Sequence, residues 1–319
     1  MGSPEPVLAD ARDVLDDNSR ALAEVLGATY LDARSPLLGA LRGCDKAQLT
    51  YATALASGDP AAVAAARSAL EQASLQLGTV VRRVVPGMPV ERVTARLRED
   101  LEAQLAARSG QPYTALRTAA GRAVDTASLL AAEVAAARRL GPTGPRAATL
   151  RAELTALLTE HVLLVGRLAG ELDAGEDAPA GGGAGGARAA LAANASDLSQ
   201  SLGGAYPAAA QPFLTAWTDH LVRLEAYAAA VAATGTAPSG ELRTAPQTFG
   251  RLLAQHIEGQ SAGRIATDLT PSLDTLLSAV DAAATGSPRS ASALHRAAAE
   301  APPPAAALAA AAAEHLRLR

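Results

Sequence analysis

The stretch PFLTAWTDHLVRLEAYAAAVA, residues 212–232, decides the fold class of this chain. Its large apolar residues recur at spacings of three and four, which is the period of one face of an α-helix. The residues of that face are Phe213, Trp217, His220, Leu224, Tyr227 and Val231. A histidine therefore interrupts an otherwise apolar stripe, and the spacing predicts that its ring points into a helical core.

Helical periodicity covers most of the chain, and the alternating β-branched runs that are typical of strands are missing. The patterns predict helices at residues 6–29, 35–57, 60–84, 89–109, 113–139, 146–172, 187–204, 207–234, 240–260, 264–285 and 289–318. Three starts carry a capping side chain before a proline, at Asp59-Pro60, Thr270-Pro271 and Ser287-Pro288. Prolines 302–304 should interrupt the last helix. We expect an all-α protein without a sheet.

The chain contains an internal repeat at an offset of 176 residues. Over residues 11–56, 16 of 46 positions are identical to those 176 residues later, against about 5 or 6 expected from composition. Tyr30 corresponds to Tyr206, Gly27 to Gly203, and Cys44 stands in the place of His220. The repeat predicts two tandem related bundles of about five to six helices each.

This repeat divides the chain into predicted parts. Residues 1–140 form a first, degenerate bundle, and residues 141–172 hold a helix that occurs once. Residues 173–187 are a linker rich in glycine and alanine, and residues 188–319 form the second bundle.

Composition excludes several classes of function. The net charge is −4 and aromatic residues make up 3%, so the chain offers neither a basic face nor a stacking platform for nucleic acid. One cysteine allows no internal disulfide and no multi-thiolate metal site. No apolar stretch is long and uncharged enough to predict a transmembrane segment. Composition does not predict the oligomeric state.

Three predicted helices, at 146–172, 207–234 and 240–260, each place a histidine on or near an apolar face. These histidines are His161, His220 and His256. Neutral imidazoles assembled between helices could bind zinc or copper, with Asn194 hydrogen-bonded to a ligand histidine. One alternative is a set of buried histidines that are hydrogen-bonded within the core, for example to Asn194. Axial ligation of a haem by one of them is another.

The residues around these histidines add little support for a metal. Glu160 and Asp219 each precede a histidine, but adjacent residues of a helix point about 100° apart, so we expect both carboxylates to face water. In the first copy, Cys44 replaces a histidine, and we expect it to be a small buried residue rather than a redox thiol.

The sequence GQSAG, residues 259–263, matches the Gly-x-Ser-x-Gly pattern of α/β-hydrolases, with Ser261 as candidate nucleophile and His256 nearby. That chemistry requires a sharp turn from a strand to a helix within a sheet. Because no sheet is predicted, we expect a turn between helices here. A hydrolase is therefore only a remote alternative.

Three segments and one tyrosine carry a resemblance to a known family: LLTEHV at 157–162, LAANASDLSQSLG at 191–203, Tyr206, and FLTAWTDHLVRLEAY at 213–227. They resemble a family of exported bacterial tandem helical-bundle proteins with no assigned activity. The resemblance implies a helical bundle located outside the cytoplasm, exported or lipid-anchored through a targeting segment that this sequence lacks. The family's histidine positions correspond to His161 and His220.

These observations predict a non-enzymatic protein outside the cytoplasm, with a structural role or a role in binding a protein partner. The alternative is a bundle that binds zinc or copper through His161, His220 and His256.

Overall fold

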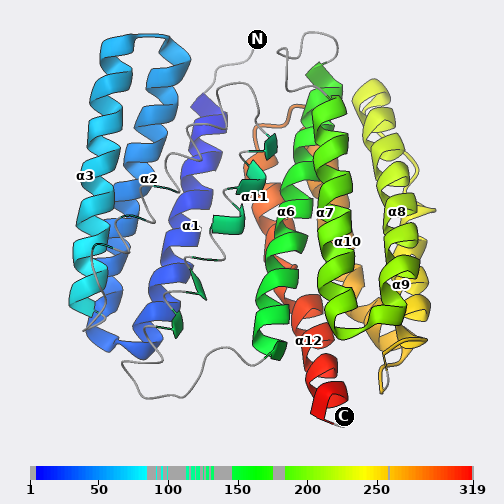
Figure 1. Ribbon diagram of the computed structural model, residues 1–319. Coiled ribbons are helices and arrows are strands. Elements are labelled where there is room, and N and C mark those ends of the chain that lie inside the picture. The colour runs from blue at the N-terminus through cyan, green and yellow to red at the C-terminus, as the bar shows by residue number, and fades with distance from the viewer. Residues whose placement is uncertain are drawn as a thin grey trace. The chain divides into compact units, whose positions relative to one another are not determined.

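The computed structural model describes residues 5–84, 146–174, 184–257 and 259–317, and isolated positions between 91 and 132. Apart from the turns that join the elements, these residues are helical, and they contain no β-strand (Figure 1), which confirms the predicted all-α class. The predicted helix at 89–109 and much of that at 113–139 lie outside the described residues. The contacts divide the chain into a first unit, residues 1–103 and 125–143, and a second unit, residues 104–124 and 144–319.

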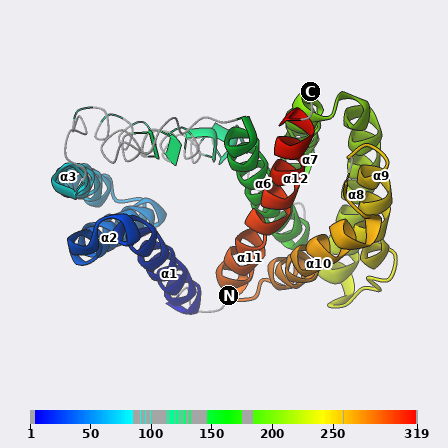
Figure 2. The same cartoon turned by 90° about the horizontal axis from the view of Figure 1, so that it is seen from below.

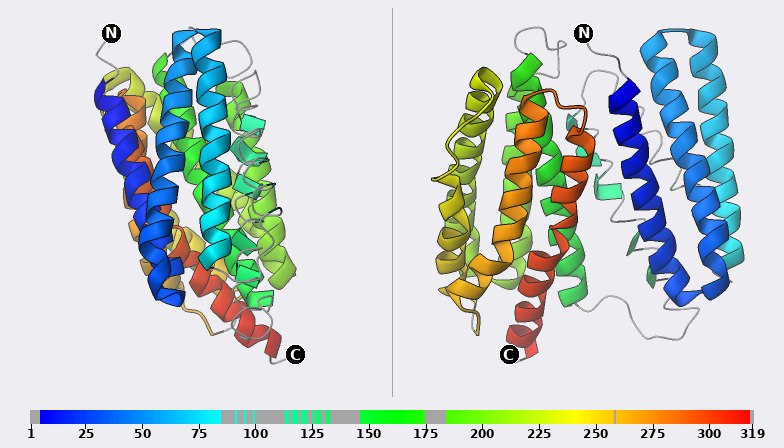
Figure 3. Two further views of the ribbon diagram at one scale, coloured as in Figure 1. Left: turned by 90° about the vertical axis from the view of Figure 1, so that its left-hand side faces the viewer. Right: turned by 180° about the vertical axis from the view of Figure 1, so that it is seen from behind.

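The first unit contains α1 (Glu5–Thr29), α2 (Arg34–Ser57) and α3 (Pro60–Val84). α2 lies between the other two and packs against both (Figure 3). A tight turn joins α2 to α3: Gly58 has φ of +69°, and the Asp59 carboxylate accepts a hydrogen bond from the Ala61 amide at 2.9 Å. This confirms the start predicted at Asp59-Pro60.

The second unit contains seven described α-helices: α6 (Arg146–Ala174), α7 (Ala184–Ala205), α8 (Pro207–Thr234), α9 (Ala245–Ala254), α10 (Ala262–Ala284), α11 (Ser290–Ala299) and α12 (Pro302–Arg317). α6 packs against α7, α8, α10, α11 and α12. The helix that occurs once in the sequence therefore belongs to the second unit. Within this unit, α8 and α9 lie on one side, α6 and α11 on the other, and α7 and α10 between them (Figures 1 and 2).

The predicted span 240–260 contains a short 3-10 turn, η3 (Leu242–Thr244), followed by α9, which ends at Ala254. The predicted start at Thr270-Pro271 is wrong, because α10 begins at Ala262 and runs through Pro271.

The predicted span 289–318 is broken between α11 and α12. Prolines 302–304 form the first turn of α12, where the backbone N–H groups that proline lacks would have no helical partner.

The same corner occurs at Tyr30 and at Tyr206, 176 residues apart. The Tyr30 amide donates to the Leu26 carbonyl, and the Tyr206 amide donates to the Leu202 carbonyl. A Cβ on Gly27 would lie 2.9 Å from the Cβ of Arg34, and one on Gly203 would lie 2.9 Å from the Cβ of Ala210. Only glycine allows this close approach of the chain on either side of the corner. The tyrosine and the glycine of each corner therefore lie at equivalent positions of the 176-residue sequence repeat.

Alanines and leucines supply most of the core of the second unit, with side chains from every described helix of that unit. Among the described helices, none combines the length and the apolar character needed to cross a membrane.

Candidate functional site

The apolar stripe of α8 faces the core, as its spacing predicts. Phe213, Trp217, Leu224, Tyr227 and Val231 are all buried, and His220 is buried among them at 7% exposure. On α6, His161 is buried at 3% exposure, as are its helix neighbours Leu154, Leu164 and Leu168. Two of the three predicted histidines are therefore buried in the core of the second unit.

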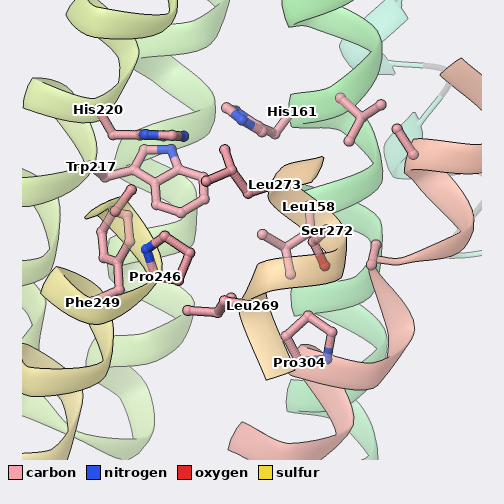
Figure 4. A pocket seen from close by; sticks show the side chains of 14 residues that line it. Leu158, His161, Trp217, His220, Pro246, Phe249, Leu269, Ser272, Leu273 and Pro304 are labelled. Carbon is pink, nitrogen blue, oxygen red and sulfur yellow. The ribbon is translucent and has the colours of Figure 1, made fainter. Parts of the chain in front are cut away.

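His161 and His220 line the same pocket, a cavity of about 70 Å³. Its lining comes from α6, α8, α9, α10 and the junction of α11 with α12. Figure 4 shows the two imidazole rings reaching toward one another from α6 and α8, with Trp217 beside them. The other lining residues are Leu158, Val162, Ala245, Pro246, Phe249, Leu269, Ser272, Leu273, Ala297, Ala301 and Pro304. Among the described residues, the lining contains no carboxylate, thiol, lysine or arginine.

Four ring nitrogens of this pocket lack hydrogen-bond partners in the described protein. Neither ring nitrogen of His161, nor Nδ1 of His220, nor the indole nitrogen of Trp217 makes a hydrogen bond there. The Ser272 hydroxyl, by contrast, donates to the Glu300 carbonyl at 2.9 Å. Leaving a buried ring nitrogen without a hydrogen bond costs about 1–3 kcal/mol. The prediction of core histidines hydrogen-bonded to the protein is therefore wrong for His161.

Burial keeps both imidazoles neutral near pH 7. Desolvation, aided by the neighbouring His220, lowers the pKa of His161 to about 3. Desolvation and the charge of Arg223 lower the pKa of His220 to about 4. A neutral imidazole carries one N–H donor and one nitrogen lone pair, so each ring can donate a hydrogen bond and also act as a ligand.

The pocket rings form a packed aromatic group. The ring centres of His161 and His220 are 6.3 Å apart, and Trp217 lies 4.9 Å from the first and 5.7 Å from the second. Phe249 packs on His220 at 5.8 Å and on Trp217 at 5.3 Å. His161 thus contacts two rings of α8, and His220 contacts rings from α6, α8 and α9.

A buried polar network lies beside the pocket, and sequence reasoning missed it. Glu160 is buried at 4% exposure, so the prediction that it faces water is wrong, whereas Asp219 is exposed as predicted. Arg117 donates to Glu160 Oε1 at 2.8 Å and also pairs with Asp197. α6 is covered on so many sides that its polar face at Glu160 has no access to water.

Asn194 belongs to this network rather than to the imidazoles. Fully buried on α7, it donates from Nδ2 to Glu160 Oε2 at 3.1 Å and to the Leu157 carbonyl at 2.9 Å. The described structure gives it no hydrogen bond to a histidine. Its role is to hold the Glu160 carboxylate, one residue before His161.

His256 is not among the residues that line the pocket. It lies in the turn after α9 and is partly exposed, while Ile257 is buried at 1% exposure. Both backbone amides bond to the Leu253 carbonyl, so the chain turns tightly here and the more apolar side chain takes the core position. Within the described residues, no group of three or more histidines, cysteines, aspartates or glutamates could hold a metal ion.

Ser261 caps α10: its Oγ accepts a hydrogen bond from the Arg264 amide at 3.2 Å. The turn before it carries Gly259 at φ of +79°, and helices stand on both sides. In the first unit, Cys44 is buried as predicted, and burial raises the pKa of its thiol to about 11. Neither residue has the surroundings of an activated nucleophile.

Comparisons of the chain with protein-family models, with curated proteins and with solved structures found no match. The likeness to exported helical-bundle proteins, the location outside the cytoplasm and the protein partner therefore stay predictions.

Proposed function

We propose that this protein is a non-enzymatic binding protein, and that a small ligand binds between His161 and His220 in the second unit. The observation that carries the proposal is the set of unpartnered ring nitrogens in an apolar pocket. Buried polar groups in folded proteins are almost always satisfied. A ligand that meets these nitrogens would relieve the cost of burying them.

The size of the pocket limits the ligand. An apolar cavity of about 150 Å³ holds one benzene molecule, whereas pockets for drug-sized ligands and cofactors measure about 300–1,000 Å³. The cavity between α6 and α8 has about 70 Å³. It suits an ion or a group of a few non-hydrogen atoms, and a haem would not enter without rearrangement.

The lining favours binding over catalysis. A nucleophilic mechanism needs a nucleophile next to a base that is itself oriented by a third group. Here the two imidazoles point toward each other, and the Ser272 hydroxyl already donates its hydrogen bond to the Glu300 carbonyl. The pocket therefore offers ligands and hydrogen-bonding groups without a nucleophile.

Trp217 is the only tryptophan of the chain, so its fluorescence reports on this pocket directly. We would titrate the protein with Ag(I), Zn(II), acetamide and pyrazole as probes of a few atoms. The same titrations in Ala245→Leu, which fills the pocket, and in Ala229→Leu, on the exposed side of α8, supply the matched variants.

We expect at least one probe to change the Trp217 emission saturably in the wild type and in Ala229→Leu, and to lose that effect in Ala245→Leu. A pocket that takes up only water would give no saturable change with any probe. That result, or an unchanged response in Ala245→Leu, would contradict the proposal.

A further inference from the structure

We infer that the ligand of this pocket is a soft monovalent cation, Cu(I), held in linear coordination between one nitrogen of His161 and one nitrogen of His220. The inference rests on the function proposed above and names its ligand. It depends on the number of ligands, their spacing and the apolar lining.

The number of ligands separates Cu(I) from Zn(II). Structural zinc sites take four protein ligands and catalytic ones at least three. As far as the structure describes it, the pocket lining supplies two imidazoles and no third histidine, cysteine or carboxylate. Imidazole binds copper well, and Cu(I) is stable with two donors on opposite sides.

The spacing of the rings agrees with linear coordination. With metal–nitrogen bonds of about 2.0–2.1 Å, two imidazoles on opposite sides of one ion have ring centres about 6 Å apart, and about 5 Å apart at a tetrahedral angle. The observed separation of the His161 and His220 ring centres is 6.3 Å. Figure 4 shows the rings pointing toward each other, as this geometry requires.

The apolar lining favours a single positive charge. The cost of burying an ion grows with the square of its charge, so a divalent cation between two neutral ligands pays about four times the cost of a monovalent one. Trp217 lies close to the proposed ion. The three ring-centre distances place the point midway between the imidazoles about 4.3 Å from the Trp217 ring centre. This distance is within the roughly 6 Å at which an aromatic ring attracts a cation that lies over its face.

The test uses Ag(I), which shares the preference of Cu(I) for linear coordination and needs no reductant, in chloride-free buffer on the untagged full chain. Because a thiol would compete for Ag(I), the titrations are made in a Cys44→Ala background. The variants are His161→Leu and His220→Phe, with His256→Gln as the matched histidine outside the pocket.

We expect one Ag(I) per chain, with quenching of Trp217 in step with binding. Replacing a metal ligand should cost more than the roughly 10–100-fold of a supporting residue, so the affinity should fall more than about 100-fold in His161→Leu and in His220→Phe. His256→Gln should bind as the parent does, and Zn(II) should not displace Ag(I) at equal concentration. Binding that survives either pocket substitution, or displacement by Zn(II), would overturn the inference.

A second measurement needs no pocket variant and holds even where one fails to fold. In ¹⁵N NMR spectra, Ag(I) should shift one ring nitrogen of His161 and one of His220 and leave His256 unchanged. A shift in only one of the two rings would overturn linear coordination. If Ag(I) fails while acetamide or pyrazole binds in the pocket, the inference falls and the proposed function stands; if every probe fails, both fall.

Discussion

Acid should destabilise the second unit through His161 and His220, whose pKa values lie well below the unfolded value of 6.5. The folded state excludes the two protons that the unfolded chain binds. Unfolding therefore takes up protons, and the stability of the folded state is complete above about pH 6.5. It falls as the pH drops below that value, until each folded ring titrates near its own pKa of about 4 or 3.

The magnitude follows from the linkage relation. One pKa unit corresponds to 1.36 kcal/mol, so at pH 5.0 each unfolded imidazole gains about 2 kcal/mol by protonation. The two histidines together should lower the free energy of unfolding by about 4 kcal/mol between pH 7.5 and 5.0. With an m-value of about 2 kcal/mol/M, the urea midpoint should fall by about 2 M.

Urea unfolding followed by Trp217 fluorescence at the two pH values measures this effect in the second unit. His161→Leu and His220→Phe should each remove about half of the pH dependence, because each eliminates one titrating ring. The carboxylates of the chain are common to all three proteins and cancel in the comparison. A wild type and variants that lose the same stability on acidification would refute the assignment of neutral, desolvated imidazoles.

Three further predictions test the surroundings of the pocket. Asn194→Ala should lower the free energy of unfolding by about 3 kcal/mol in thermal melting, because it removes a donor from the buried Glu160 carboxylate. The control Gln200→Ala, at an exposed position of the same helix, should stay within about 0.5 kcal/mol of the wild type. Ser261→Ala should cost about 1 kcal/mol through the lost cap of α10, and its rate of p-nitrophenyl acetate hydrolysis should equal that of the wild type; a lower rate would revive the hydrolase hypothesis. Gly250→Ala should cost about 3 kcal/mol or more in urea unfolding, since its Cβ would overlap the Ala262 carbonyl, while Gly204→Ala, with open space, should cost nothing.

The sequence allowed the fold class and half of the site to be predicted. Helical period alone placed His220 in the core, because Trp217 and Leu224 on either side of it fix which face of α8 is buried. The predicted spans 187–204 and 207–234 also left a break at Tyr206, where the structure has its corner between α7 and α8. These features depend on neighbours within one or two helical turns.

The rest depends on packing between distant segments. The burial of Glu160 is compensated by Arg117, which lies 43 residues away in the sequence, and no local pattern predicts that pairing. His256 and Ile257 both follow Leu253 at helical spacings, and only the end of α9 at Ala254 decides which side chain enters the core. His161 and His220 likewise point toward each other only because α6 packs against α8.

The central claim is that His161 and His220 hold a ligand between α6 and α8, and crystals of the protein grown with Ag(I) test it most directly. The account predicts a single anomalous peak in the pocket, at about 2.1 Å from one nitrogen of each ring. A pocket that contains only water, with the silver bound elsewhere on the chain, would contradict it.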